Sequence, residues 1–261
     1  MKVIIAALLL SLSTTAFAQP SPEEIAEWRA AAGQGEAWAQ SNLGQMYDRG
    51  DGVPQDSAVA MKWWTKAAEQ GYAKAQYNLA LMYADGEGVP KDNATAVKWY
   101  TKAAEQGYAD AQYNLGLMYV NGRGVPEDDT TAVKWFNKAA GQGDADAQFY
   151  LGIMYANGEG VPEDDATAVM WYTKAAEQGN VDAQYNLGNL YRFGDGVAQN
   201  DATALKWYTK AAEQGAAGAQ LNLGLMYAKG EGVPENNMPA SMWLNLVAAQ
   251  GPELSLVHIS V

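Results

Sequence analysis

Residues 73–107 read AKAQYNLALMYADGEGVPKDNATAVKWYTKAAEQG, and close copies of this stretch make up most of the chain. The turn at its centre, Gly-x-Gly-Val, occurs six times, each copy 36 residues after the last. The copies begin at Gly50, Gly86, Gly122, Gly158, Gly194 and Gly230. A strict period of this length is typical of repeat proteins, in which each unit buries its apolar face only by stacking on its neighbours.

The first half of the repeat predicts an amphipathic helix, which we call helix A. Ala75, Leu79, Met82 and Tyr83 fall on one helical face. The neighbouring position holds Ala80 here and glycine in the other five copies. Because glycine weakens a helix interior by about 1 kcal/mol relative to alanine, we expect another backbone to pass close to this position.

The second half predicts a second helix, which we call helix B. Asp92 is placed to cap its first turn, and Asp or Asn occupies the same position in every copy. Ala96, Trp99 and Ala103 contribute to its apolar stripe, together with Tyr100, while lysines lie on the opposite side. A glycine at the end of the copy predicts where the helix stops.

Together these signals predict an all-α fold. We expect an α/α solenoid, a superhelical array of about six 36-residue helix pairs preceded by an N-terminal capping helix. The predicted boundaries are a signal peptide at 1–18, the capping helix at 19–36, the solenoid at 37–251 and a C-terminal tail at 252–261. The tail has no helical stripe, and it could be an open end, an interface with another chain or a truncation.

The N-terminus predicts export. A basic start precedes an apolar run over 3–10, and Ala16-Phe17-Ala18 fits a secretory cleavage site. The run is too short to act as a stop-transfer helix, although a retained anchor is the alternative. We therefore expect a periplasmic or fully secreted chain with no membrane insertion after cleavage.

Composition disfavours several function classes. The formal net charge is −13, so we expect no nucleic-acid partner. There is no cysteine, and the single histidine is His258 in the tail, so His- or Cys-dependent metal and nucleophile sites are not expected within the repeats. We predict no metal, no cofactor and no enzymatic activity.

The repeated pattern resembles the Sel1-like repeat family, a relative of the tetratricopeptide repeats. The helix B motif, Ala-x-x-Trp-Tyr-x-Lys-Ala-Ala-Glu-Gln-Gly, stands almost unchanged in residues 94–107, 166–179 and 202–215. The resemblance implies a scaffold or adaptor that binds a protein or peptide. Some cysteine-rich relatives have been linked to binding or hydrolysing penicillin-type compounds, but this chain lacks the cysteines that define that branch.

The resemblance also implies a ligand surface on the concave face, lined by the A helices. An aromatic and aliphatic series edged by polar residues marks this face in the sequence. The candidate binding residues are Tyr77, Leu81, Asp110, Tyr113, Leu117, Asp146, Phe149, Ile153, Tyr185, Asn189 and Arg192. The alternative is that the rings only pack between adjacent A helices, because the periodicity fits both arrangements equally.

Three functions remain open from the sequence. The first is an exported, non-catalytic scaffold that binds a protein or peptide partner. The second is an enzyme acting on β-lactam or cell-wall compounds, and the third is a secreted host-interaction factor.

Overall fold

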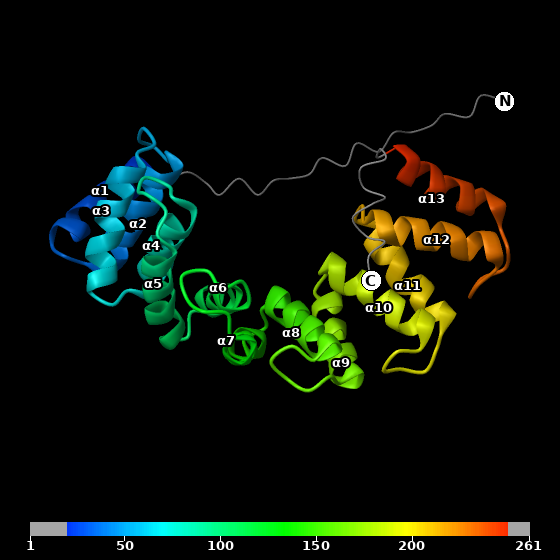
Figure 1. The fold of residues 1–261 in the computed structure, drawn as a ribbon. Helices are drawn as coiled ribbons and strands as arrows, with labels where there is room; N and C mark the ends of the chain where they lie inside the picture. Colours follow the sequence, from blue (N-terminus) through cyan, green and yellow to red (C-terminus); the bar gives the residue numbers. More distant parts are fainter. Residues whose placement is uncertain (1–19, 250–261) are drawn as a thin grey trace, which may run out of the picture. The chain divides into compact units, whose positions relative to one another are not determined.

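The computed structural model describes residues 20–249, in which the chain forms thirteen α-helices and no strand (Figure 1). The helices are α1 (Pro22–Gly33), α2 (Ala37–Arg49), α3 (Ser57–Glu69), α4 (Ala73–Asp85), α5 (Asn93–Glu105), α6 (Ala109–Val120), α7 (Asp129–Gly141), α8 (Ala145–Asn157), α9 (Asp165–Glu177), α10 (Val181–Phe193), α11 (Asp201–Glu213), α12 (Ala217–Lys229) and α13 (Asn237–Ala249). Even-numbered helices are A helices, and odd-numbered helices from α3 onward are B helices. The predicted all-α repeat solenoid of six helix pairs is confirmed.

The chain divides into two compact units at the junction of Lys91 and Asp92, the first holding α1–α4 and the second α5–α13. Within each unit, helices that follow one another in the sequence pack against one another. The predicted boundaries at 37 and 251 stay predictions, and the predicted signal peptide and tail lie outside the described residues.

The B helices begin where the capping residues predict. The Asp92 carboxylate accepts a hydrogen bond from the Thr95 backbone N–H at 3.0 Å, and Asp128 and Asp164 do the same for the residue three positions on. Asn200 makes the equivalent bond in α11, at 2.9 Å. These side chains satisfy N–H groups that the first helical turn leaves unpaired.

The glycine inside helix A has a different cause from the one that the sequence suggested. A Cβ on Gly116 would lie 2.5 Å from the Phe136 ring of the same repeat, and one on Gly152 would lie 2.6 Å from the Tyr172 ring. The close neighbour is therefore an aromatic side chain of helix B, and the expectation of a passing backbone is wrong at this position.

The close backbone lies instead at the second glycine of the turn. Gly124 has a φ of +75°, and a Cβ on it would lie 2.4 Å from the backbone of Asn93 at the start of the preceding B helix. Gly160 meets Asp129 in the same way. These turns thus rest on the helix B start of the previous repeat, and only glycine fits both the angle and the space.

A buried glutamine in each A helix joins successive repeats. Gln148 donates to the backbone oxygen of Ala140 at the end of α7, at 3.2 Å, and accepts from Gln178 at the end of α9, at 2.8 Å. Gln184 makes the equivalent pair of bonds with Ala176 and Gln214. The Ala140 and Ala176 carbonyls also accept from the N–H groups of Gly143 and Gly179 in the turns. The almost fully buried glutamines therefore find partners for their own polar groups and connect the repeats.

Candidate functional site: the A-helix face of the second unit

The candidate residues of the second unit lie on α6, α8 and α10, and we call their common surface the A-helix face. Tyr113 and Leu117 pack against the core cluster that contains Phe136. Phe149 and Ile153 pack against the next cluster, and Tyr185 packs against the one after that. All five side chains are half-buried, so each contributes to the core and also reaches the surface.

Each ring on this face contacts helix B of its own repeat, and Tyr113 also contacts the next A helix. The Tyr113 ring centroid lies 5.8 Å from that of Tyr150 in α8 and 6.0 Å from that of Phe136 in α7. Phe149 lies 5.9 Å from Tyr172, and Tyr185 lies 6.0 Å from Tyr208. These distances are typical of favourable aromatic pairs, so packing accounts for much of the ring series.

Carboxylates border the face at the helix starts. Asp110 and Asp146 are exposed in the first turns of α6 and α8, where the helix dipole favours a negative charge. Asp146 accepts a hydrogen bond from the Asn180 side chain at 2.9 Å. Burial is the main cause that raises the pKa of the Tyr113 hydroxyl, and nearby carboxylates including Asp146 raise it further. Tyr113 is therefore a neutral hydrogen-bonding group at ordinary pH.

Tyr77 and Leu81 lie in α4, within the first unit, and are also half-buried. The same sequence positions thus give the same partial exposure in both units.

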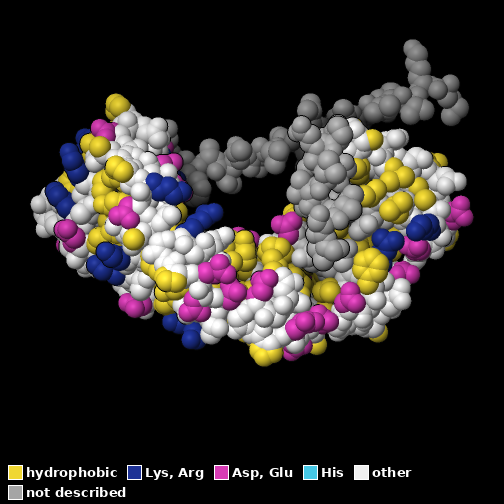
Figure 2. Space-filling view, in the orientation of Figure 1, with side chains coloured by type: hydrophobic (Ala, Val, Ile, Leu, Met, Phe, Trp, Pro, Cys, Tyr) yellow, Lys and Arg dark blue, Asp and Glu magenta, His cyan; other side chains and the backbone are white. Residues whose placement is uncertain are grey.

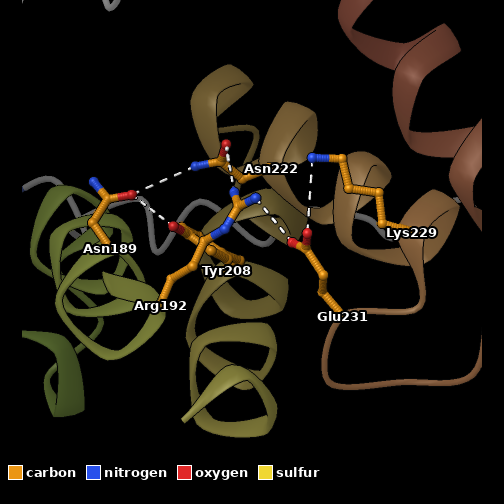
Figure 3. Close-up of polar contacts among 6 residues, drawn as sticks. All are labelled: Asn189, Arg192, Tyr208, Asn222, Lys229 and Glu231. Atoms are coloured by element: carbon orange, nitrogen blue, oxygen red, sulfur yellow. Dashed lines mark hydrogen bonds and ion pairs between the residues drawn. The ribbon is translucent and has the colours of Figure 1, made fainter. Parts of the chain in front are cut away.

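The series of aliphatic residues on the A-helix face is interrupted at α10. Where the other A helices of the second unit carry leucine or isoleucine, as at Leu117 and Ile153, α10 carries Asn189. One turn further on, α10 carries Arg192 where they carry alanine or valine. Figure 3 shows these two side chains with Asn222 of α12 and Glu231 of the following turn. Among the A helices of the second unit, only α10 is polar at both positions, and in the first unit α2 is polar there as well, with Gln45 and Asp48.

The contacts of the cluster connect three helices and a turn. The Tyr208 hydroxyl donates to Asn189 Oδ1 at 2.6 Å, and burial raises the pKa of Tyr208 to about 12. Arg192 Nη1 donates to Asn222 Oδ1 at 3.4 Å, and Nη2 forms an ion pair with Glu231 at 3.0 Å (Figure 3). Lys229 lies 3.8 Å from the same carboxylate, so two cations face one anion.

The B helices carry a different and more uniform surface. In α7, the Lys138 Nζ lies 4.1 Å from the Trp135 ring centroid. The equivalent pair occurs in α5, α9 and α11 of the second unit and in α3 of the first, at 4.2 to 4.7 Å. Such contacts cover the ring with the lysine stem while the charge stays in water.

Sequence reasoning did not identify two of these features, although both left a signal. The dipeptide Ala-Gln recurs in every A helix, and its glutamine forms the buried link between repeats. The change from leucine or isoleucine to Asn189 marks the polar cluster. Its partners Tyr208, Asn222 and Glu231 could not be found from spacing alone, because they come from other helices and a turn.

Over residues 20–249, no group of three or more His, Cys, Asp or Glu side chains is arranged to hold a metal ion. No helix in the same range is both long enough and apolar enough to cross a membrane.

Comparison with known proteins identifies the repeat. The Sel1 repeat family matches residues 39–72, 73–108, 109–144, 145–180, 181–215 and 217–252. No curated protein sequence matches the chain.

Two solved structures are similar to the chain over most of its length. One is c5321, described as a protective antigen present in uropathogenic Escherichia coli strains displaying an SLR fold, at 44% identity and a TM-score of 0.86. The match covers 88% of this chain and 50% of that one, so this chain spans about half the length of c5321. The other is a Sel1 repeat protein from Oxalobacter formigenes, at 36% identity and a TM-score of 0.76, covering 86% of this chain and 90% of that one.

Sel1 repeat proteins are generally non-catalytic scaffolds that mediate protein interactions. Six matched repeats, the 36-residue period and the helix-pair packing agree with one another. The chain therefore belongs to the Sel1 repeat family.

Proposed function

We propose that this chain is an exported, non-catalytic scaffold that binds a segment of another protein on the A-helix face. The observation that carries this proposal is the difference between the two helix surfaces. The B helices repeat one lysine-over-tryptophan arrangement, whereas the A-helix face changes from aliphatic at α6 and α8 to polar at α10. A surface that varies between otherwise similar repeats can distinguish the successive residues of a bound segment.

The chemistry of the face suggests what the partner segment carries. Half-buried rings and aliphatic side chains offer contacts for apolar groups, and a partner that covers them removes more apolar area from water. The exposed Asp110 and Asp146 favour basic residues beside those groups, since opposite charges speed and orient association. The cluster around Arg192 and Lys229 provides one position for an acidic group of the partner.

A site-specific crosslinking experiment tests this proposal. A photoreactive amino acid replaces Asp110 or Asp146, which are exposed and need not disturb the core. Matched control sites are Lys134 and Met170, which are exposed on B helices of the same unit. Crosslinks to one protein from the A-helix sites and not from the B-helix sites support the proposal, whereas crosslinks from the B helices alone contradict it.

The captured protein then allows a binding measurement. We expect Arg192→Ala to weaken its binding about tenfold, because a charge-assisted contact contributes on the order of 1.5 kcal/mol. Unchanged affinity in this variant would show that the polar cluster is not part of the binding surface. Turnover of nitrocefin by the purified chain would contradict the non-catalytic part of the proposal.

Export rests on the apolar run and the Ala-Phe-Ala site near the N-terminus. A periplasmic location is the first expectation. The similarity to a protective antigen favours a second candidate, a host-facing protein released from the cell. Fractionation separates the two, because a periplasmic chain is released by osmotic shock and a secreted one is recovered from the culture medium.

A further inference from the structure

The outer face of α13 differs from the same face of the other five B helices. At the two outer positions where those helices carry lysine, apart from Met170 in α9, α13 carries Met242 and Leu246, and Met238 takes the place of an alanine or threonine. The equivalent residues are Lys62, Lys98, Lys134, Met170 and Lys206 for the first position and Lys66, Lys102, Lys138, Lys174 and Lys210 for the second.

These three side chains form a continuous exposed stripe. Their spacing of four residues places them one above another on a single helix face. Met238 is 81% exposed, Met242 51% and Leu246 43%. They account for three of the seven exposed large hydrophobic side chains in residues 20–249, and Figure 2 shows hydrophobic side chains gathered over the region of α12 and α13. Packing does not explain the stripe, since Trp243 already covers the core at this end.

The charge of the chain indicates which partner fits this stripe. The chain has a net charge of −13, so two copies repel each other over most of their surface. Helix α13 contains no Asp, Glu, Lys or Arg, which makes it a place where two copies can meet without opposing charges. A stripe of residues at i, i+4 and i+8 is also self-complementary about a two-fold axis.

We infer that a second copy of this chain packs on the Met238, Met242 and Leu246 stripe of α13. In an antiparallel arrangement with the axis near Met242, Met238 of one copy meets Leu246 of the other. A 13-residue helix is about 20 Å long, so the contact is smaller than the roughly 800 Å² per partner of a standard interface. The dimer is therefore weak, with a Kd on the order of 10–100 μM.

Sedimentation of the purified, processed chain between about 1 μM and 1 mM tests the inference. The test variant is M242K/L246K, which introduces the lysines that α3, α5, α7 and α11 carry at both positions and therefore suits the fold. The control is Met170→Lys in α9, the same repeat position and the same type of change at a residue that is 43% exposed. Helical circular dichroism and Tm confirm that both variants are folded.

We expect concentration-dependent dimers for the unchanged chain and for M170K, and monomers for M242K/L246K. Added salt should strengthen the dimer, because it screens the repulsion between the acidic copies. A chain that stays monomeric up to about 1 mM overturns the inference and leaves the stripe to another occupant. Equal dimerisation of all three proteins also overturns it, because the interface then lies elsewhere.

Discussion

In the second unit, the B helices keep nearly the same residues from repeat to repeat, whereas the A helices change theirs. Lysine lies over tryptophan in α5, α7, α9 and α11, and a large ring from each of α7, α9 and α11 fills the space beside a glycine of the paired A helix. On α6, α8 and α10 the surface changes from Leu117 and Ile153 to Asn189. The comparison indicates that packing constrains the residues of the B helices, whereas the residues of the A-helix face can differ from repeat to repeat.

The largest expected effect is a difference in stability between two phenylalanine-to-alanine variants, one in a B helix and one in an A helix. Phe136 of α7 is fully buried, whereas Phe149 of α8 is half-buried on the A-helix face. Phe136→Ala leaves a cavity and should lower the free energy of unfolding by about 3–5 kcal/mol. Phe149→Ala should cost clearly less and should weaken partner binding. Urea unfolding of both variants checks this, and equal losses would remove the distinction between the helices.

The next effect concerns the glutamine that joins successive repeats. Gln148→Met keeps the side-chain size but removes one of the two hydrogen bonds of the buried Ala140 carbonyl, which still accepts from the Gly143 backbone N–H at 3.0 Å. We expect a loss of about 0.5–1.5 kcal/mol, the typical net contribution of one hydrogen bond. Gln178→Met is the control, because Gln178 is exposed and water can replace its bond to Gln148. Similar urea midpoints for the two variants would show that the glutamine link contributes little.

The smallest effect is a pH dependence at the starts of the B helices. Hydrogen bonds from the Thr167 hydroxyl and backbone N–H are the main causes that lower the pKa of Asp164. Because the folded pKa is below the unfolded one, this stabilisation is complete above about pH 4 and is lost as the pH falls through the folded value. Asp164→Asn keeps a capping oxygen, as Asn200 does in α11, but removes the titration. Thermal melts from pH 6 to acid should therefore show a weaker pH dependence, and an unchanged profile would contradict this account of the cap.

The repeat made the fold predictable, because the same helix and turn signals occur at the same positions in all six copies and support one another. Helix B starts, the turns and the apolar stripes followed from capping residues, glycines and spacing. The helix glycine was misread because sequence cannot tell a neighbouring backbone from a ring such as Phe136, which lies 20 residues further along the chain. The site was harder, since a half-buried ring such as Tyr113 gives the same pattern whether it only packs or also binds.

The most direct test of the account is hydrogen exchange of the chain with and without its captured partner. The account predicts slower exchange in α6, α8 and α10, strongest near Arg192, with little change in α7, α9 and α11. Protection confined to the B helices would contradict it, because the partner would then bind the uniform lysine and tryptophan surface.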